Sequence, residues 1–388
     1  MKKQDWILFL GFCAAMLTLP LWGSLIGASY PNIMQKIAIF AIFAMGFNLL
    51  FGLTGYLSFG QAAFIGVGSY TAVWMFKLFS MDVIPAIILA TLMGGLVAYL
   101  MGVVALRRSG IYFSILTLAF AEMMYRMAYS DLLGKFFGTM VTNGETGLQL
   151  NRHDPRILDT ALGHVVESGL PSTSFLGMPI SSNGMAGFFL CAALACLGFL
   201  IALLITRSSF GVVLRAIKAN KGRLGYSGIS TRPYLITIFV ISGMYAGLAG
   251  GLMASTNVLA GAERMQWTAS GEVVLMTILG GVGTLVGPVL GSATIKLIEA
   301  KVSTWNETVV EHFFSFIPGD FGHTVGLVAS KFVGEGWHLS LGLLFMLVVI
   351  FLPGGIMEGI EKLTGRVTKS KAEDEAKVVS QASEEKKG

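Results

Sequence analysis

The side chains of this chain that could do chemistry inside an apolar helix are one acid and one base. Glu122 lies well inside an apolar stretch, and Arg126 follows four residues later, on the same face of a helix. An ionisable group at such depth is a candidate for function, because apolar surroundings disfavour a charge. The spacing predicts an i,i+4 ion pair near the outer end of the helix. The alternative is that Glu122 faces a polar path and biases its open or closed state.

Other groupings that carry catalysis or bind metals are missing from the sequence. No stretch has the form G-x-x-x-x-G-K-[ST], so the chain has no Walker A loop to hold ATP phosphates. The three cysteines lie in apolar runs and are interpreted as buried small hydrophobic residues. Five histidines share no metal spacing and are predicted at the surface: His153, His164, His312, His323 and His338. We therefore expect no enzyme, no metal site and no cofactor on this chain, and an intramembrane hydrolase remains only a rival hypothesis.

The composition indicates a membrane protein. Hydrophobic residues make up 54% of the 388 residues and charged residues 13%, about half the charged fraction of a soluble domain. Apolar runs long enough to cross a bilayer lie at residues 6–26, 33–52, 60–79, 84–106, 110–130, 185–206, 233–258 and 338–357. The sequence therefore predicts an all-α polytopic membrane protein with about eight crossing helices. The first run is longer than a signal-peptide core and is interpreted as a retained helix.

The positions of lysine and arginine predict the orientation. Basic residues gather at 2–3, 107–108, 207–232 and from 362 onward. With alternating crossings all four groups fall on one side, which the positive-inside rule identifies as the cytoplasm. We therefore expect the inner, cytoplasmic membrane, with both termini cytoplasmic. This arrangement requires the further apolar stretch 271–300 to make no crossing or two.

Glycine-rich breaks interrupt the chain in each half. Residues 280–288 contain four glycines and Pro288, which predicts a re-entrant pair of half-helices joined by a turn. Residues 52–61 form a second break. Irregular backbone inside a membrane needs protein or water as a partner, so both breaks are expected to line a translocation path. The candidate path residues are Gly52, Gly55, Ser58, Gly60, Gln61, Glu122, Gly280, Gly281 and Gly283.

Two further features near these breaks have structural interpretations. Small residues between 242 and 251 form a stripe that predicts close helix packing. Glu272, at the start of the hairpin, is interpreted as a charge at a helix N-terminus on the outer surface.

The basic segment 207–232 is too long for a tight turn. Val213, Ala216, Ile217 and Leu224 can share one side of a short helix that glycines then end. Such a helix either docks on a soluble partner or lies at the membrane surface and touches lipid only. The candidate docking residues are Arg215, Lys218, Asn220, Gly222, Arg223, Gly225 and Gly228.

The expected organisation has three parts. Residues 1–32 hold the first helix and an external turn, 33–363 the transmembrane domain, and 364–388 a disordered charged tail in the cytoplasm. Segments 131–184 and 301–337 are predicted to be external loops, each too small for an independent domain.

Several stretches, in order, resemble one family. Residues 48–72, NLLFGLTGYLSFGQAAFIGVGSYTA, are similar to the signature of LivM-type permeases, the membrane subunits of branched-chain amino acid ABC importers. Residues 111–122, 142–148, 215–220, 247–252 and 351–356 are similar in type and order. The resemblance covers about residues 33–300 and 338–358.

The resemblance implies an ABC importer permease fold and a set of partners. These are a second, LivH-like permease subunit, two cytoplasmic ATPases that bind ATP and Mg²⁺, a periplasmic or extracellular substrate-binding protein, and membrane lipid, with no nucleic acid. Residues 215–228 would be the coupling helix that sits in an ATPase cleft. The sequence departs from the family there, with Ala219 and Lys221 in place of acidic residues. The implied solute is a branched-chain amino acid, urea or a short amide, and a stand-alone channel or secondary transporter is the alternative class.

Overall fold

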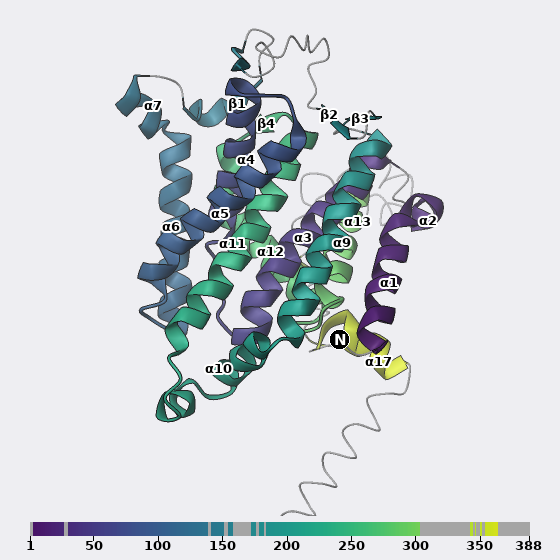
Figure 1. Ribbon diagram of the computed structural model, residues 1–388, viewed down its shortest axis with the longest axis vertical. Coiled ribbons are helices and arrows are strands. Elements are labelled where there is room, and N and C mark those ends of the chain that lie inside the picture. Colours follow the sequence, from purple (N-terminus) through teal and green to yellow (C-terminus); the bar gives the residue numbers. More distant parts are fainter. Residues whose placement is uncertain are drawn as a thin grey trace, which may run out of the picture.

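The computed structural model describes residues 3–26, 30–138, 141–150, 154–157, 172–175, 178–181, 184–302, 342–343, 346, 350 and 354–363. Its helices are α1 (Lys3–Leu17), α2 (Leu19–Ile26), α3 (Pro31–Thr54), α4 (Gln61–Leu78), α5 (Val83–Ala105), α6 (Ile111–Tyr129), α7 (Leu132–Phe137), α9 (Gly184–Arg207), α10 (Ser209–Tyr226), α11 (Thr231–Thr256), α12 (Trp267–Gly280), α13 (Gly287–Val302) and α17 (Gly355–Leu363). The 3-10 turns are η1 (Gly144–Thr146) and η2 (Ala262–Met265). The predicted all-α class is confirmed (Figure 1).

Extended structure in the described residues is confined to two short antiparallel pairs. Strand β1 (Leu148–Gln149) pairs with β4 (Leu259–Ala260), and β2 (Ser172–Phe175) pairs with β3 (Met178–Ser181). Both pairs lie at the end of the molecule away from α10 (Figure 1).

The six predicted spans between residues 33 and 258 agree with α3, α4, α5, α6, α9 and α11 to within two residues at each end. Within the described residues, α3, α5, α9 and α11 are long and apolar enough to cross a membrane by length and composition. Most of the predicted span 338–357 lies outside the described residues. So do the five histidines, the tail 364–388 and the external loop 301–337 except for its first two residues, which end α13.

The first apolar run was expected to form one helix, but it forms two. Helix α1 ends at Leu17 and α2 begins at Leu19, with Pro20 as its second residue. Proline has no backbone N–H and clashes with the preceding turn, so a continuous helix breaks here. Helix α1 packs on α9, where the rings of Phe12 and Phe199 stack with centroids 4.3 Å apart.

Helix α3 forms the centre of the bundle. Its most apolar window is 94% buried, against 39% for α5 and 44% for α9. Helix α11 packs between α4 and α5 at small residues, because a Cβ on Gly68 would lie 2.3 Å from the carbonyl oxygen of Gly247. A Cβ on Gly247 would lie 2.6 Å from the carbonyl oxygen of Ala90. The packing role predicted for the small residues of 242–251 is confirmed.

The predicted pair of short helices is confirmed as a hairpin of α12 and α13. They contain 14 and 16 residues, about 21 and 24 Å at 1.5 Å per residue, each shorter than a hydrocarbon core of about 30 Å. The turn that joins them, Gly281–Val286, lies beside the end of α3 and beside α17, where the carbonyl oxygen of Gly354 is 2.9 Å from the position of a Cβ on Gly281. We call this segment the hairpin turn.

The described residues of the four predicted basic groups lie at one end of the molecule. Figure 1 places α10, α17 and the start of α1 together at that end. Arg207, at the end of α9, forms an ion pair of 2.7 Å with Asp5 of α1. The guanidinium of Arg232 donates a hydrogen bond of 3.4 Å to the carbonyl oxygen of Val103, near the end of α5. This common position agrees with the predicted clustering of basic residues on one side.

Candidate functional site

The last two turns of α3 hold the hairpin turn through one amide. Asn48 donates a hydrogen bond of 2.7 Å from Nδ2 to the carbonyl oxygen of Thr284, and its Oδ1 accepts one of 2.8 Å from the backbone N–H of Gly283. Asn48 is 6% exposed. At Gly52, one turn further on, a Cβ would lie 2.9 Å from the Cα of Gly283. The side-chain amide and the close backbone approach together fix the hairpin turn on α3.

Helix α10 contacts the same end of α3 through two lysines. The ammonium of Lys218 donates a hydrogen bond of 3.0 Å to the carbonyl oxygen of Gly52. Lys221 donates one of 3.1 Å to the hydroxyl of Tyr56, just beyond the helix. The end of α3, where Gly55 adopts φ +76°, is therefore joined to α10 on one side and to the hairpin turn on another.

Helix α10 is anchored along its first half. Leu214 and Ile217 are buried, and the hydroxyl of Ser208 accepts a hydrogen bond from the N–H of Gly211, as expected of an N-cap. Arg215 donates a hydrogen bond of 3.0 Å to the carbonyl oxygen of Thr206 in the last turn of α9. Its guanidinium therefore stabilises the junction of α9 and α10.

The predicted end of this helix was wrong in one respect. Gly222 and Gly225 lie inside α10, and the interruption falls at Asn220, whose backbone has φ −160° and ψ 98°. The side-chain oxygen of Asn220 accepts a hydrogen bond of 3.0 Å from the N–H of Arg223, so it restarts the helix. Gly228, with φ +78°, follows the helix end.

Residues 218–228 form an exposed tip, with every residue exposed except the half-buried Leu224. Tyr226 is 95% exposed. A fully exposed tyrosine beside cationic residues is typical of a protein-binding surface, where tyrosine and arginine are enriched. Sequence reasoning missed Tyr226, although its position between Gly225 and Gly228 could have indicated it.

The hairpin contains a buried cation that the sequence analysis did not identify. The ammonium of Lys296 lies 2.6 Å from a carboxylate oxygen of Glu272 and 2.6 Å from one of Glu299. It also lies 3.6 Å from the ring centroid of Phe40 on α3. The Lys296 side chain is 6% exposed. This group, which we call the Lys296 triad, joins α12 to α13 and places the cation against α3.

The interpretation of Glu272 as a surface charge at a helix N-terminus was wrong. Glu272 lies in the second turn of α12 and its carboxylate pairs with Lys296. The pairing partner is 24 residues away in sequence, so local spacing gave no sign of it. Within the described residues, no three His, Cys, Asp or Glu side chains are grouped closely enough to hold a metal ion.

The candidate path residues near α4 are packed inside the chain. Ser58 and Gln61 are fully buried, and the Gln61 amide donates a hydrogen bond of 3.0 Å to the hydroxyl of Ser242 on α11. A Cβ on Gly60 would lie 2.5 Å from the terminal methyl of Met101.

The remaining glycines of the path set divide between the interior and the surface. Gly52, Gly280 and Gly281 are buried, whereas Gly55 and Gly283 are exposed, and Gly55 lies beside Lys218 of α10. The structure brings Gly52, Gly281 and Gly283 together and leaves Gly60 and Gln61 apart from them.

The predicted ion pair of α6 is present. Arg126 donates a hydrogen bond of 2.8 Å from Nε to Glu122, and the two side chains are 71% and 37% exposed. Both lie on a face of α6 that also exposes Ile115, Ala119 and Met123. The exposed large residues of α5, by contrast, carry no formal charge: Ile84, Ile88, Leu89, Leu92, Leu96, Tyr99, Leu100 and Val104.

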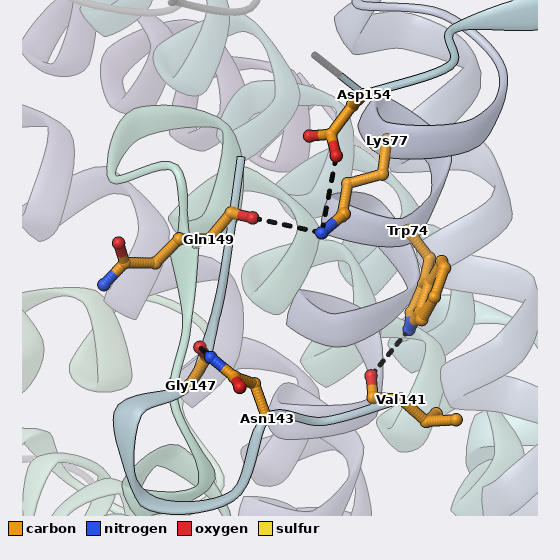
Figure 2. A network of polar contacts seen from close by, with 7 residues as sticks. All are labelled: Trp74, Lys77, Val141, Asn143, Gly147, Gln149 and Asp154. Atoms are coloured by element: carbon orange, nitrogen blue, oxygen red, sulfur yellow. Dashed lines mark hydrogen bonds and ion pairs between the residues drawn. The ribbon is translucent and has the colours of Figure 1, made fainter. Parts of the chain in front are cut away.

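At the opposite end of the molecule, loop residues are held on α4 (Figure 2). The indole N–H of Trp74 donates a hydrogen bond of 2.9 Å to the carbonyl oxygen of Val141. Lys77 lies 3.5 Å from the carboxylate of Asp154 and donates to the carbonyl oxygen of Gln149. These contacts fix the described part of the loop 131–184 over the end of α4.

Asp131, between α6 and α7, organises the same loop. Partial burial alone would raise its pKa, but hydrogen bonds from the N–H and hydroxyl of Thr142 and the N–H of Gly134 outweigh burial and hold the pKa below its usual value. The carboxylate is therefore ionised at neutral pH. Its hydrogen bonds hold Thr142 against the end of α6, where the single hydroxyl hydrogen of Thr142 is shared between Asp131 and the carbonyl oxygen of Ala128.

Comparison of this sequence with known proteins identifies one family that matches most of the chain. The sequence model of the branched-chain amino acid transport system / permease component family matches residues 29–352. The high-affinity branched-chain amino acid transport system permease protein LivM of Escherichia coli K12 is 24% identical over 311 residues, which cover 76% of this chain and 69% of that protein. The probable branched-chain amino acid transport permease protein LivH of Methanocaldococcus jannaschii is 22% identical over 275 residues, which cover 68% of this chain and 77% of that protein.

A shorter match is to a permease named for a different solute. The guanosine ABC transporter permease protein NupP of Bacillus subtilis 168 is 33% identical over 108 residues, which cover 26% of this chain and 31% of that protein. No solved structure matches the chain. The resemblance to LivM-type permeases is confirmed: this chain belongs to the family of permease components of branched-chain amino acid transport systems, which are multi-pass membrane proteins and not themselves enzymes.

Proposed function

We propose that this chain is the permease subunit of an ABC importer in the cytoplasmic membrane, and that it moves a branched-chain amino acid or a similar small polar solute inward. ATP is hydrolysed on separate subunits. One observation carries the proposal: the exposed tip of α10 is bonded, through Lys218 and Lys221, to the same end of α3 that holds the hairpin turn. A force applied at that tip reaches the membrane-embedded hairpin directly.

The partners follow from the family and from this geometry. A LivH-like second permease completes the pore, a cytoplasmic ATPase binds the tip 218–228, a second ATPase binds the other permease, and a substrate-binding protein delivers solute to the outer side. We assign both termini to the cytoplasmic side, and the common position of α10, α17 and the start of α1 at one end supports this assignment (Figure 1). Loop residues 141–150 then lie on the outer side.

Movement would pass from α10 to the hairpin through α3. ATP-driven closure of the ATPases displaces the tip, and the lysines transmit the displacement to the backbone at Gly52 and to Tyr56. Asn48 and the close contact of Gly52 with Gly283 carry it to the hairpin turn. Alternating access requires such a two-position element, and the hairpin of α12 and α13, whose turn is bonded to α3 through Asn48, is the element we assign.

Helix α6 is the part of this chain that we expect to face the solute. An exposed Glu122–Arg126 pair is poorly placed against lipid, so its face is better placed against the second permease or a water-filled path. At the cytoplasmic end of the path, Gly55 and Gly283 are exposed, so their backbone groups can form hydrogen bonds with the solute.

The test is reconstitution of the complex and of the chain alone. The chain is co-expressed with a LivH-like permease, two ATPase subunits and a substrate-binding protein, and leucine uptake into liposomes is measured. We expect uptake that needs ATP and all partners. Leucine flux through the purified chain alone would instead support a stand-alone channel or secondary transporter. A binding protein that takes urea or an amide and ignores leucine would change the solute and leave the importer mechanism in place.

Replacing Tyr226 by alanine is expected to weaken ATPase binding by roughly thirtyfold, the effect of losing an interface side chain worth about 2 kcal/mol. The measurement is the affinity of the purified ATPase for the permease in nanodiscs. Tyr30→Ala is the matched control, since Tyr30 is 71% exposed at the opposite end of α3. Equal binding by the Tyr226→Ala protein would show that this tip does not contact the ATPase.

Replacing Glu122 by glutamine is expected to lower the rate of uptake several-fold while the free energy of unfolding changes by less than about 1 kcal/mol, as for other exposed ion pairs. Arg126→Gln removes the same pair and is the matched control for stability. Unchanged uptake kinetics in the Glu122→Gln protein would leave the ion pair a structural role only.

A further inference from the structure

The segment that joins α11 to α12 enters the bundle from the end that carries loop 141–150. It contains the 3-10 turn η2, which packs against α4 and α6. The guanidinium of Arg264 in this turn donates a hydrogen bond of 3.2 Å from Nη1 to the hydroxyl of Ser69 on α4. Ser69 lies nine residues before the end of α4, about 14 Å at 1.5 Å per residue. The irregular segment therefore reaches well inside the bundle.

This segment carries polar and charged side chains at that depth. Glu263 is exposed, and Arg264 and Gln266 are half-buried. Irregular backbone and ionisable groups inside a membrane protein are tolerated where they line a water-filled space or meet another chain. The exposed side of η2 therefore belongs to a polar surface within the bundle, and its two charges are candidates for function.

Arg264 has hydrogen-bonding capacity that the described residues do not use. A guanidinium carries five N–H donors, and among those residues the only acceptor bonded to the Arg264 side chain is the hydroxyl of Ser69. The Nε and Nη2 atoms have no partner there and are not enclosed by the protein. Ser69 is neutral, and its hydroxyl donates to the carbonyl oxygen of Gly250 on α11. The cation is therefore held in place by Ser69 and remains open to an anion.

Glu263 places the opposite charge beside this cation. Its exposed carboxylate interacts electrostatically with Arg264, but these two described side chains form no direct ion pair. Glu122 and Arg126 on α6, by contrast, are bonded at 2.8 Å. Two neighbouring opposite charges that stay apart can each bind the matching charge of a molecule that carries both.

The N-terminus of α12 follows directly after these residues and also lies inside the bundle. The hydroxyl of Ser270, in the first turn of α12, accepts a hydrogen bond of 2.8 Å from the N–H of Ala62, the second residue of α4. The side chain of Gln266 does not cap the helix, so the first N–H groups of α12 keep the positive end of the helix dipole. A short helix that begins within a membrane protein can direct this end at the anionic group of a solute.

We propose that Glu263, Arg264 and the N-terminus of α12 bind the solute as a zwitterionic α-amino acid. The solute carboxylate accepts hydrogen bonds from Nε and Nη2 of Arg264 and lies near the first N–H groups of α12, while the solute ammonium pairs with Glu263. A neutral urea or amide would leave both protein charges without a partner, and a site of this kind rejects such a molecule. The inference rests on the proposed importer function and selects an amino acid among the solutes considered there.

The test measures solute binding in the absence of the substrate-binding protein, which would otherwise select the solute. The permease pair with its two ATPases is placed in nanodiscs, and bound radiolabelled leucine is displaced by unlabelled compounds. These are leucine, leucinamide, which lacks the carboxylate, isocaproate, which lacks the ammonium, and urea. We expect leucinamide and isocaproate to need concentrations roughly tenfold higher than leucine, the factor for one lost hydrogen bond to a charged group. Urea should not compete.

Two variants assign the two solute charges to their residues. Arg264→Gln can still donate to Ser69, and it should erase the difference between leucine and leucinamide while the difference between leucine and isocaproate remains. Glu263→Gln should have the reverse effect. Lys77→Gln is the matched control, because it removes a cation of α4 that pairs with Asp154 outside this site, and it should change neither difference. If Arg264→Gln weakens the binding of leucine and leucinamide equally, Arg264 has only a structural role and the assignment is wrong.

Three results with the unmodified complex would also overturn the proposal. Equal competition by leucine and leucinamide would show that the carboxylate is not recognised. Competition by urea at the concentration of leucine would show a site for neutral solutes. An absence of leucine binding would remove the site, whereas ATP-dependent leucine uptake with the binding protein present would leave the importer function standing. The unmodified complex and the Glu263→Gln variant decide the proposal even where the Arg264→Gln protein fails to fold.

Discussion

Replacing Lys296 by methionine is expected to lower the free energy of unfolding by about 3–5 kcal/mol, the effect of removing one partner from a buried ion pair. Lys296 is 6% exposed and is the cation between Glu272 and Glu299. Without it, two carboxylates face each other in a largely apolar hairpin, and Phe40 loses the cation over its ring. The measurement is the unfolding transition of the protein in nanodiscs, followed by circular dichroism.

The control for this variant replaces all three charges. Lys296→Met combined with Glu272→Gln and Glu299→Gln removes the unpaired carboxylates and should recover most of the loss, because a buried network without net charge is close to neutral in stability. A single Lys296→Met protein as stable as the unmodified one would mean that the carboxylates reach solvent and that the triad does not hold the hairpin on α3.

The membrane-crossing segments could be predicted from the sequence because their signal is local. A run of about 20 apolar residues is long enough to span a bilayer whatever the rest of the chain does. The ends of α3 and α9 agree with the predicted runs 33–52 and 185–206 to within two residues. The glycine-rich stretch 280–288 likewise predicted a turn from local backbone chemistry alone.

The residues that connect these elements could not be predicted, because their partners are distant in sequence. Asn48 binds Thr284, 236 positions away, and Lys218 binds Gly52, 166 positions away. Nothing near Asn48 distinguishes it from an ordinary polar residue in a helix. The fold must be known before its two hydrogen bonds can be seen. The candidate path set therefore included the glycines that approach closely and omitted the side chain that fixes them.

Replacing Asn48 by alanine is expected to reduce ATP-dependent uptake by more than about tenfold while the ATPase still binds. The substitution leaves two backbone groups of the hairpin turn, the N–H of Gly283 and the carbonyl of Thr284, without their present partner. Each unsatisfied group costs about 1–3 kcal/mol where it stays buried, so the hairpin turn detaches from α3 and no longer follows α10. The measurement is the ratio of solute molecules taken up to ATP hydrolysed.

Gln35→Ala provides the matched control on the same helix. Gln35 is a buried amide, 1% exposed, that donates a hydrogen bond of 2.8 Å to the carbonyl oxygen of Gly184 at the other end of α3. Its loss should lower stability and leave the ratio of uptake to hydrolysis unchanged. Asn48→Asp should be intermediate, since a carboxylate still accepts from Gly283 but cannot donate to Thr284. If Asn48→Ala and Gln35→Ala lower the ratio equally, α3 acts only as a packed core helix, and transmission must run through the contacts of α10 with α9 and α11 instead.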